Sequence, residues 1–339
     1  MGRAALILIV ALAVSFGYIS NSIRGTMNAL TASMSSYNQY SMARDLARTA
    51  VHTTLRAIDR GITIPTSGSF SSGSFTVSTY FVVDTLWMTT IGTYGDSSYR
   101  MDLKLQMSTK PFFMPGGAMS INATVDGFTV NGQPTIDGRN HSIDGTTLTG
   151  SGDLPGITMK TAADSAYISQ HQSQLNLYGS PAGLKMDSST TDPAPFINEY
   201  YQSADNIVNV GDPLPASPWG TLAVPQITFL DAGSDTSQTI TLSGNIEGCG
   251  ILVVRGNIKI SGSFTFIGLM VVDGTTNVLD FTASGNCSII GGTIMTGNAV
   301  DLTISGTASK GKMLYSSDAL DKAKNIGKLR FYKVMEWYE

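Results

Sequence analysis

The chain carries no charged side chain between Arg3 and Arg24, and the stretch from Ala4 to Ile19 is almost wholly apolar. Twenty residues of α-helix rise about 30 Å, the thickness of the hydrocarbon core of a bilayer. A secretory signal peptide is a competing interpretation, but its apolar stretch is usually only about 7–15 residues. A helix that is apolar all round must be buried on every side. We therefore expect a retained segment that is covered by lipid or by a bundle of identical helices.

The helical pattern continues without a proline from Thr26 to Arg60. Apolar residues recur there on one helical face, at spacings of four, four, four and three: Ala43, Ala47, Val51, Leu55 and Ile58. Gly61 is a suitable C-cap and Pro65 a suitable stop. Residues 2–60 are therefore predicted to form one helix of about 90 Å. A plain single-span anchor explains the first 25 residues equally well, but not this unbroken continuation.

The second half of this predicted helix has a charged face opposite its apolar one. Asp45–Arg48 and Arg56–Asp59 have the spacing of i,i+3 ion pairs. If the helix packs among copies of itself, the same face offers charge pairs between subunits, formed by Arg44, Asp45, Arg48, Arg56 and Asp59. The residues expected to pack in the core of such a bundle are Leu6, Leu8, Ile9, Leu12, Val14, Phe16, Ile19 and Ile23.

Four parts of the chain resemble type IV pilins, and most closely the PilX-type pilus assembly proteins. Three of them are the hydrophobic opening, the amphipathic continuation MARDLARTAVHTTLRAIDRG and the C-terminal YKVMEWYE. The segment MTTIGTYGDSSYRMDL (88–103) is similar to the strand–turn–strand of that family's head. The resemblance implies a subunit that is stored in membrane lipid and then polymerised with identical subunits into an extracellular filament. It also implies a pilus assembly machinery and a prepilin peptidase that leaves Met1 as the mature first residue, although Met1 is equally explained as the initiator.

One position departs from the family pattern. Most type IV pilins have a glutamate at the fifth mature position, which pairs with a neighbour's N-terminal amine, whereas this chain has Ala5. A buried unpaired carboxylate is costly, so its absence is physically tolerable. The usual contact that sets the register between subunits is put in question, as it is by the extra charge of Arg3.

After a Ser/Gly stretch, Thr66 to Gly73, which we interpret as a linker, the hydrophobic period changes from 3.6 to 2. Residues 99–107 alternate apolar and polar side chains, as in a strand with one buried face. Tyr94 to Ser97 has the composition of a turn. We predict an antiparallel sheet over residues 62–110 that packs on the helix near Val51, with a further strand from the C-terminal residues 328–339.

Residues 240–316 contain an internal repeat. Four segments align from leading glycines at 244, 262, 285 and 306, and each of the first three has a second glycine six places later. The spacings of 18, 23 and 21 residues are about one turn of a β-helix, in which stacked coils complete one another's core. We therefore predict a β-helix head over residues 111–327, with less regular coils around Gly127, Gly138 and Gly145. An ordinary β-sandwich with glycine-rich turns is the alternative.

Residues 151–235 interrupt this pattern, and we interpret them as an excursion that rejoins the stack. Thr161 to Asp164 resembles a capping box at the start of a short helix through Gln170. A second short helix is predicted from Pro195 through Ala204, with proline in its first turn.

The two cysteines, Cys249 and Cys287, fall two coils apart and at different places in the repeat. Coils stack about 4.8 Å apart, so their Cα atoms are expected to be about 10 Å apart or more. A disulfide needs roughly 7 Å or less. We predict two free, buried thiols.

The sequence offers no strong signal for chemistry. A net charge of −4 gives no basic surface for nucleic acid, and the three histidines are scattered. The charged residues of the repeat are expected not to converge, because we place them at different coil offsets: Glu247, Arg255, Lys259, Asp273, Asp280 and Asp301. Asp273, before Gly274, is interpreted as a turn residue. We expect no catalytic, metal or cofactor site.

The tightest polar cluster contains Asp137, His141 and Asp144. It has the makings of a calcium site or of an acid–base pair acting on a sugar, but turn chemistry explains it better. Glycosylation sequons begin at Asn122, Asn140 and Asn286 and are weak signals.

Together these patterns predict an α+β protein: a long pilin-type helix over residues 1–61, an antiparallel sheet and a β-helix head. Its predicted function is that of a structural subunit of a cell-surface filament, anchored in the inner membrane before assembly. Two alternatives stay open: a membrane-anchored or secreted β-solenoid adhesin or carbohydrate-active enzyme, and a minor pilin or pseudopilin.

Overall fold

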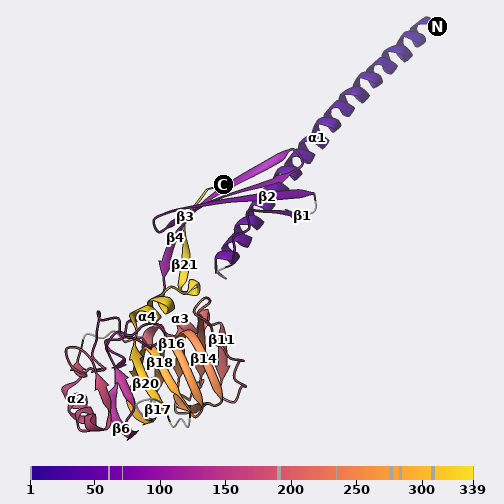
Figure 1. Ribbon diagram of the computed structural model, residues 1–339. Helices are drawn as coiled ribbons and strands as arrows, with labels where there is room; N and C mark the ends of the chain where they lie inside the picture. Colours follow the sequence, from indigo (N-terminus) through magenta and orange to yellow (C-terminus); the bar gives the residue numbers. More distant parts are fainter. Residues whose placement is uncertain are drawn as a thin grey trace. The chain divides into compact units, whose positions relative to one another are not determined.

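The computed structural model describes residues 2–59, 62–70, 72–188, 192–233, 235–274, 278–281, 285–306 and 310–338. The chain divides into two compact units (Figure 1). Unit 1 consists of Met1–Thr109 and Arg330–Glu339, and unit 2 of Lys110–Leu329. The described structure has one long N-terminal helix, and most of its other elements are β-strands, which confirms the predicted α+β class.

Unit 1 begins with helix α1 (Gly2–Asp59), which is continuous over 58 residues. At the standard rise it is about 87 Å long. It passes through Gly17 and Gly25 without a break, although glycine lowers helix stability. The predicted single helix is confirmed, whereas Gly61, the expected C-cap, lies outside the described residues.

The remainder of unit 1 is an antiparallel sheet of five strands in the order β1-β2-β3-β4-β21. The expected turn joins β3 to β4, with Gly95 at a φ of 57°. The C-terminal strand β21 lies beside β4. The strands are β1 (Ser67–Phe70), β2 (Gly73–Val82), β3 (Thr85–Tyr94), β4 (Ser97–Thr109) and β21 (Arg330–Tyr338).

Strand β1 corrects the interpretation of residues 66–73 as a linker, because Ser67–Phe70 pair with β2. Gly68 lies opposite Phe75, and a Cβ at Gly68 would come within 2.4 Å of the Phe75 ring. The small residues therefore make room for an aromatic side chain on the neighbouring strand. Their composition, which is typical of a linker, here serves packing.

The second half of α1 packs on one face of this sheet, as predicted (Figure 1). The contact is close because small side chains meet it from both sides. A Cβ at Gly92 would lie 2.1 Å from the carbonyl oxygen of Ala43 and 2.5 Å from the backbone nitrogen of Ala47. The buried residues of this interface are Ala47, Ala50, Val51, Phe75, Val77, Leu86, Met88, Met101, Leu103 and Leu105.

Unit 2 is built from parallel strands in two sheets. The first sheet contains β5 (Met119–Ile121), β7 (Thr135–Asp137), β8 (Ile157–Met159), β9 (Asn176–Tyr178), β10 (Leu184–Met186), β11 (Asn206–Asn209), β12 (Gln226–Asp231), β14 (Asn245–Arg255), β16 (Ser263–Gly274), β18 (Cys287–Gly297) and β20 (Gly311–Tyr315). The second contains β6 (Thr124–Gly132), β13 (Thr239–Leu242), β15 (Asn257–Ile260), β17 (Val278–Phe281) and β19 (Ala299–Gly306).

The first three repeats pair in the register that their glycines predict. Gly250 of β14 lies beside Gly268 of β16, which lies beside Gly291 of β18. All three have φ between 130° and 134°, a conformation that favours glycine. The fourth repeat is shifted by three residues, since Cys287 pairs with Gly311 and not with the residue at 308. Residues 307–309 lie outside the described part of the chain.

The order of strands in space differs from their order in the sequence. Strands β5 and β6, which precede the repeats, pair with β18 and β19 near the end of the chain. Strand β8 pairs with β5 on the side away from β18. Towards the other end of the sheet, β12 pairs with β14 on the side away from β16. Residues 151–235 are therefore more than an excursion, because their strands extend the first sheet at both of its ends.

Short helices in unit 2 are α2 (Ala162–Ser169), α3 (Ile197–Ser203) and α4 (Ser317–Lys324), with 3-10 turns at Gln172–Gln174, Ala194–Phe196 and Gly327–Leu329. The predicted cap of α2 is confirmed, since the Thr161 hydroxyl accepts a hydrogen bond from the backbone N–H of Asp164 at 3.1 Å. The segment around Gly127 and Gly138 forms β6 and the end of β7, but Ile143 to Gly145 is a turn.

Candidate functional site

The first half of α1 is a large exposed apolar surface. The eight residues that we expect to pack in a helix bundle are between 51% and 67% exposed in the single chain. Within the described part of unit 1, the sheet contacts only the second half of the helix (Figure 1). The helix is long and apolar enough to cross a membrane. Water is a poor solvent for such a surface, so a lipid or protein partner must cover it.

The charged face of α1 is only partly as expected. Asp45 and Arg56 are exposed, whereas Arg44 and Arg48 are half-buried. No ion pair among the described residues joins Asp45 to Arg48, so that predicted intrahelical pair is wrong. The Nε of Arg44 is buried and has no hydrogen-bond partner within the described structure. The side chain of Asp59 lies outside the described residues.

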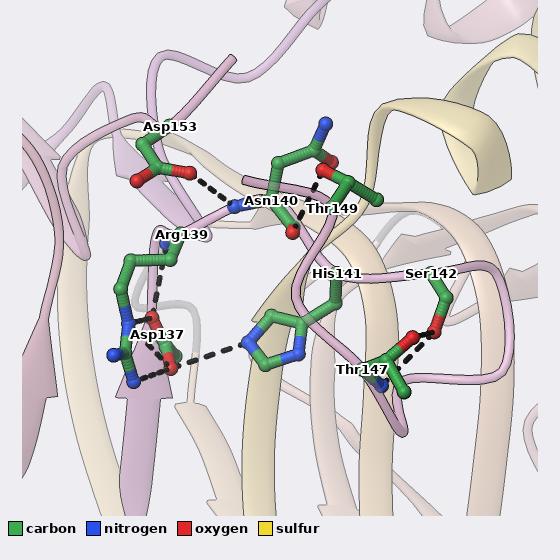
Figure 2. A network of polar contacts seen from close by, with 8 residues as sticks. All are labelled: Asp137, Arg139, Asn140, His141, Ser142, Thr147, Thr149 and Asp153. Carbon is green, nitrogen blue, oxygen red and sulfur yellow. Dashed lines mark hydrogen bonds and ion pairs between the residues drawn. The ribbon is translucent and has the colours of Figure 1, made fainter. Parts of the chain in front are cut away.

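In unit 2, the structure brings the side chains of Asp137 and His141 together (Figure 2). Asp137 is 2% exposed and accepts hydrogen bonds from Nε and Nη2 of Arg139, at 2.9 and 2.7 Å. Nε2 of His141 lies 3.2 Å from Oδ2 of Asp137. Burial alone would raise the pKa of Asp137, but the hydrogen bonds from Arg139 lower it below its ordinary value.

The neighbours of this pair hold the fold together. Asn140 is 6% exposed, and its side chain donates to the Ser151 carbonyl and accepts from the backbone N–H of Ser317 at the start of α4, each at 2.9 Å. Asp144 accepts from the Ser142 hydroxyl and from the backbone N–H of Thr146, as in a turn. The described residues contain no group of three or more metal-ligating side chains.

A second polar row runs across neighbouring strands of the first sheet, and the sequence interpretation missed it. Asp231, Arg255, Asp273 and Thr296 lie side by side on β12, β14, β16 and β18. Arg255, Asp273 and Thr296 each follow their leading glycine by eleven residues, so our placement of Arg255 and Asp273 at different offsets was wrong. Counting that offset would have found the row. Asp273 also lies within β16 and is not a turn residue.

The row contains two acids: Asp231 is paired with Arg255, whereas the side chain of Asp273 has no hydrogen-bond or ion-pair partner among the described residues. Arg255 donates to both oxygens of Asp231, at 2.8 and 2.5 Å. Burial alone would raise the pKa of Asp231, but Arg255 lowers it below its usual range. Burial raises the pKa of Asp273, and the charge of Asp192 raises it further. Asp192, from outside the repeat, accepts a hydrogen bond from the Thr296 hydroxyl.

Both cysteines are free thiols in the structure, and both are buried. Cys249 pairs with Ile267 of β16, and Cys287 with Phe264 of the same strand, so β16 separates them. Burial raises the pKa of each thiol.

The sequons differ in accessibility. Asn122 and Asn140 are buried, whereas Asn286 is exposed.

No protein-family profile matches the sequence, and no curated protein matches it. Among solved structures, the chain is similar to the competence-associated pilin ComZ from Thermus thermophilus. That alignment has 11% identity and covers 89% of this chain and 97% of that one, with a TM-score of 0.24. A score this low does not establish a common fold.

Proposed function

We propose that the chain is the structural subunit of a type IV pilus-like filament outside the cell. Its α1 helix would lie in membrane lipid before assembly and among the helices of identical subunits afterwards, with the β-rich units facing outward. The observation that carries this proposal is the exposed apolar half of α1, on a helix that continues without a break into the sheet of unit 1.

The size of the apolar surface supports assembly. Fully burying a large aliphatic or aromatic side chain is worth about 1.5–3 kcal/mol. The eight expected core residues are 51% to 67% exposed in the single chain, so burying what remains contributes roughly 7–15 kcal/mol gross. Loss of rotational and translational freedom opposes this term. A lipid bilayer and a bundle of like helices both supply such burial, which fits a subunit that moves from one to the other.

Two finer assignments belong to the same proposal. The resemblance of residues 88–103 and of the C-terminus to PilX-type proteins supports that family, with a prepilin peptidase and an assembly machinery as partners. The parallel register of β14, β16 and β18, with glycine stacked on glycine, supports a β-helix in unit 2. We further propose that the filament subunit has no catalytic role.

One observation favours a second candidate function, glycan cleavage by unit 2. Asp192 and Asp273 are neighbouring carboxyl groups, and the pKa of Asp273 is raised while that of Asp231 is lowered. Acid–base catalysis uses pairs of carboxyl groups whose environments separate their pKa values. Cleavage of a polysaccharide that is lost in Asp273→Asn would establish this function, and its absence across a polysaccharide panel would remove it.

Negative-stain microscopy of purified protein tests the filament. Val14→Asp places a charge in the proposed helix core, and we expect it to abolish uniform fibres, because an unpaired buried carboxylate costs several kcal/mol in every subunit. Val224→Asp makes the same change at a residue of unit 2 with similar exposure, 64% against 66%, and should leave the fibres intact. A parent protein that stays monomeric in water without detergent would refute the proposal.

A further inference from the structure

Arg24 is the only charged residue between Arg3 and Arg44. It is exposed on α1, and no side chain of the described structure forms an ion pair with it. In a bundle of α1 helices this guanidinium would be surrounded by apolar helix surface. A buried cation without a counter-charge is strongly destabilising, so assembly requires a carboxylate beside it.

The α1 helix of the same chain cannot supply that carboxylate. The acidic residues of α1 are Asp45 and Asp59. Asp45 is 21 residues from Arg24, which is about 32 Å along the helix. Asp59 is about 52 Å away. Within a bundle of α1 helices, a counter-charge for Arg24 must therefore come from the helix of another copy.

Asp45 of another copy is a suitable partner for Arg24. Its side chain is exposed and forms no ion pair among the described residues. Arg44, its neighbour in sequence, points to a different side of the helix. Asp45 is the one charged residue lining a groove of about 220 Å³, and the groove is otherwise formed by Met42, Leu46, Thr49, Phe70 and Tyr94.

We propose that Arg24 of one copy pairs with Asp45 of an adjacent copy, with the two α1 helices parallel and offset by about 32 Å along their axes. This inference rests on the proposed filament. The contact is heterologous, since each copy offers Arg24 to one neighbour and Asp45 to another, and such contacts generate open helical polymers.

The offset also accounts for apolar side chains further along α1. With a shift of 21 residues, residues 6–23 of one copy lie beside residues 27–44 of the next. That second segment carries five large side chains that its own sheet leaves between 48% and 75% exposed: Met27, Leu30, Met34, Tyr37 and Tyr40. The apolar half of the neighbouring helix would cover them. One offset thus satisfies both the charge and the apolar surface.

Disulfide trapping in filaments of the full chain tests the offset. In the double variant Arg24→Cys/Asp45→Cys the two thiols of one chain are too far apart to join, because a disulfide needs Cα atoms within roughly 7 Å. Every bond between them therefore links two copies. We expect oxidation to give a ladder of covalent multimers, and each single variant to give dimers at most. The native cysteines are buried and do not interfere.

The control Arg24→Cys/Arg56→Cys places the second thiol about 48 Å along the helix. It should give no ladder. A ladder from this control, or none from filaments of the 24/45 variant, would overturn the inference while leaving the filament intact. If the cysteine variants do not assemble, Arg24→Asp should prevent assembly and Arg24→Asp/Asp45→Arg should restore it, and failure to restore would count equally against the pair. Absence of filaments from the parent protein would instead refute the proposed function.

Discussion

Gly250, Gly268 and Gly291 lie side by side on adjacent strands of unit 2, and they permit a quantitative test of how closely these strands pack. Gly268 has a φ of 133°, and a Cβ added there would lie 2.0 Å from the carbonyl oxygen of Gly250 on the adjacent strand. Gly268→Ala therefore meets two penalties. The backbone conformation costs an alanine about 1–3 kcal/mol, and the overpacked contact costs about 1–3 kcal/mol. We expect a loss of about 4 kcal/mol in the free energy of unfolding of unit 2.

The two buried thiols report the unfolding of this region, because they lie on the strands either side of β16. The full-length protein is equilibrated at increasing urea concentrations and given a short pulse of a thiol-reactive reagent, and labelled protein is counted by mass spectrometry. With an m-value of about 3 kcal/mol/M, a loss of about 4 kcal/mol lowers the midpoint by about 1.3 M.

Two controls separate the penalties. Gly211 has a φ of 89° but open space around its Cβ position, so Gly211→Ala should lower the midpoint by the backbone penalty alone. Gly327 has neither constraint, and Gly327→Ala should leave the midpoint unchanged. If Gly268→Ala behaves like Gly211→Ala, the close approach of the strands is wrong. If it behaves like Gly327→Ala, both the backbone conformation of Gly268 and the close approach of the strands are wrong.

Two further predictions concern the interface between α1 and its sheet, and Asp273 in the polar row of unit 2. Gly92→Val should separate α1 from its sheet at a cost of about 2–4 kcal/mol, seen as faster amide hydrogen exchange at residues 43–57, while Gly25→Ala, which has open space, should not change exchange there. Because the pKa of Asp273 is raised in the folded state, its ionisation opposes folding at neutral pH, and stability is regained as the pH falls through that raised pKa. Asp273→Asn should therefore be more stable than the parent at pH 7, with the difference shrinking towards pH 4 in urea titrations followed by circular dichroism; a variant that is less stable at pH 7 would contradict the assigned environment.

The helix of unit 1 was predictable because its signals are local. An uncharged apolar run, an apolar face at helical spacing and the absence of proline are all read within a few turns, and each survives in α1. Strand β1 was not predictable, because the need for glycine at position 68 comes from the ring of Phe75 on another strand, which leaves no room for a Cβ. Composition cannot distinguish a flexible linker from a strand whose small residues make room for a large side chain on the neighbouring strand.

The sequence alone determined the long helix with its exposed apolar half, and the register of the first three repeats, since glycines at a fixed offset mark the same backbone turn in each. Only the tertiary structure decided that β5 and β6 lie beside β18 and β19, that the fourth repeat shifts by three residues, and that Asp192 accepts a hydrogen bond from Thr296 beside Asp273. The physical reason is that periodicity describes one segment at a time. Parallel pairing is instead decided by hydrogen bonds and side-chain packing between segments far apart in the chain.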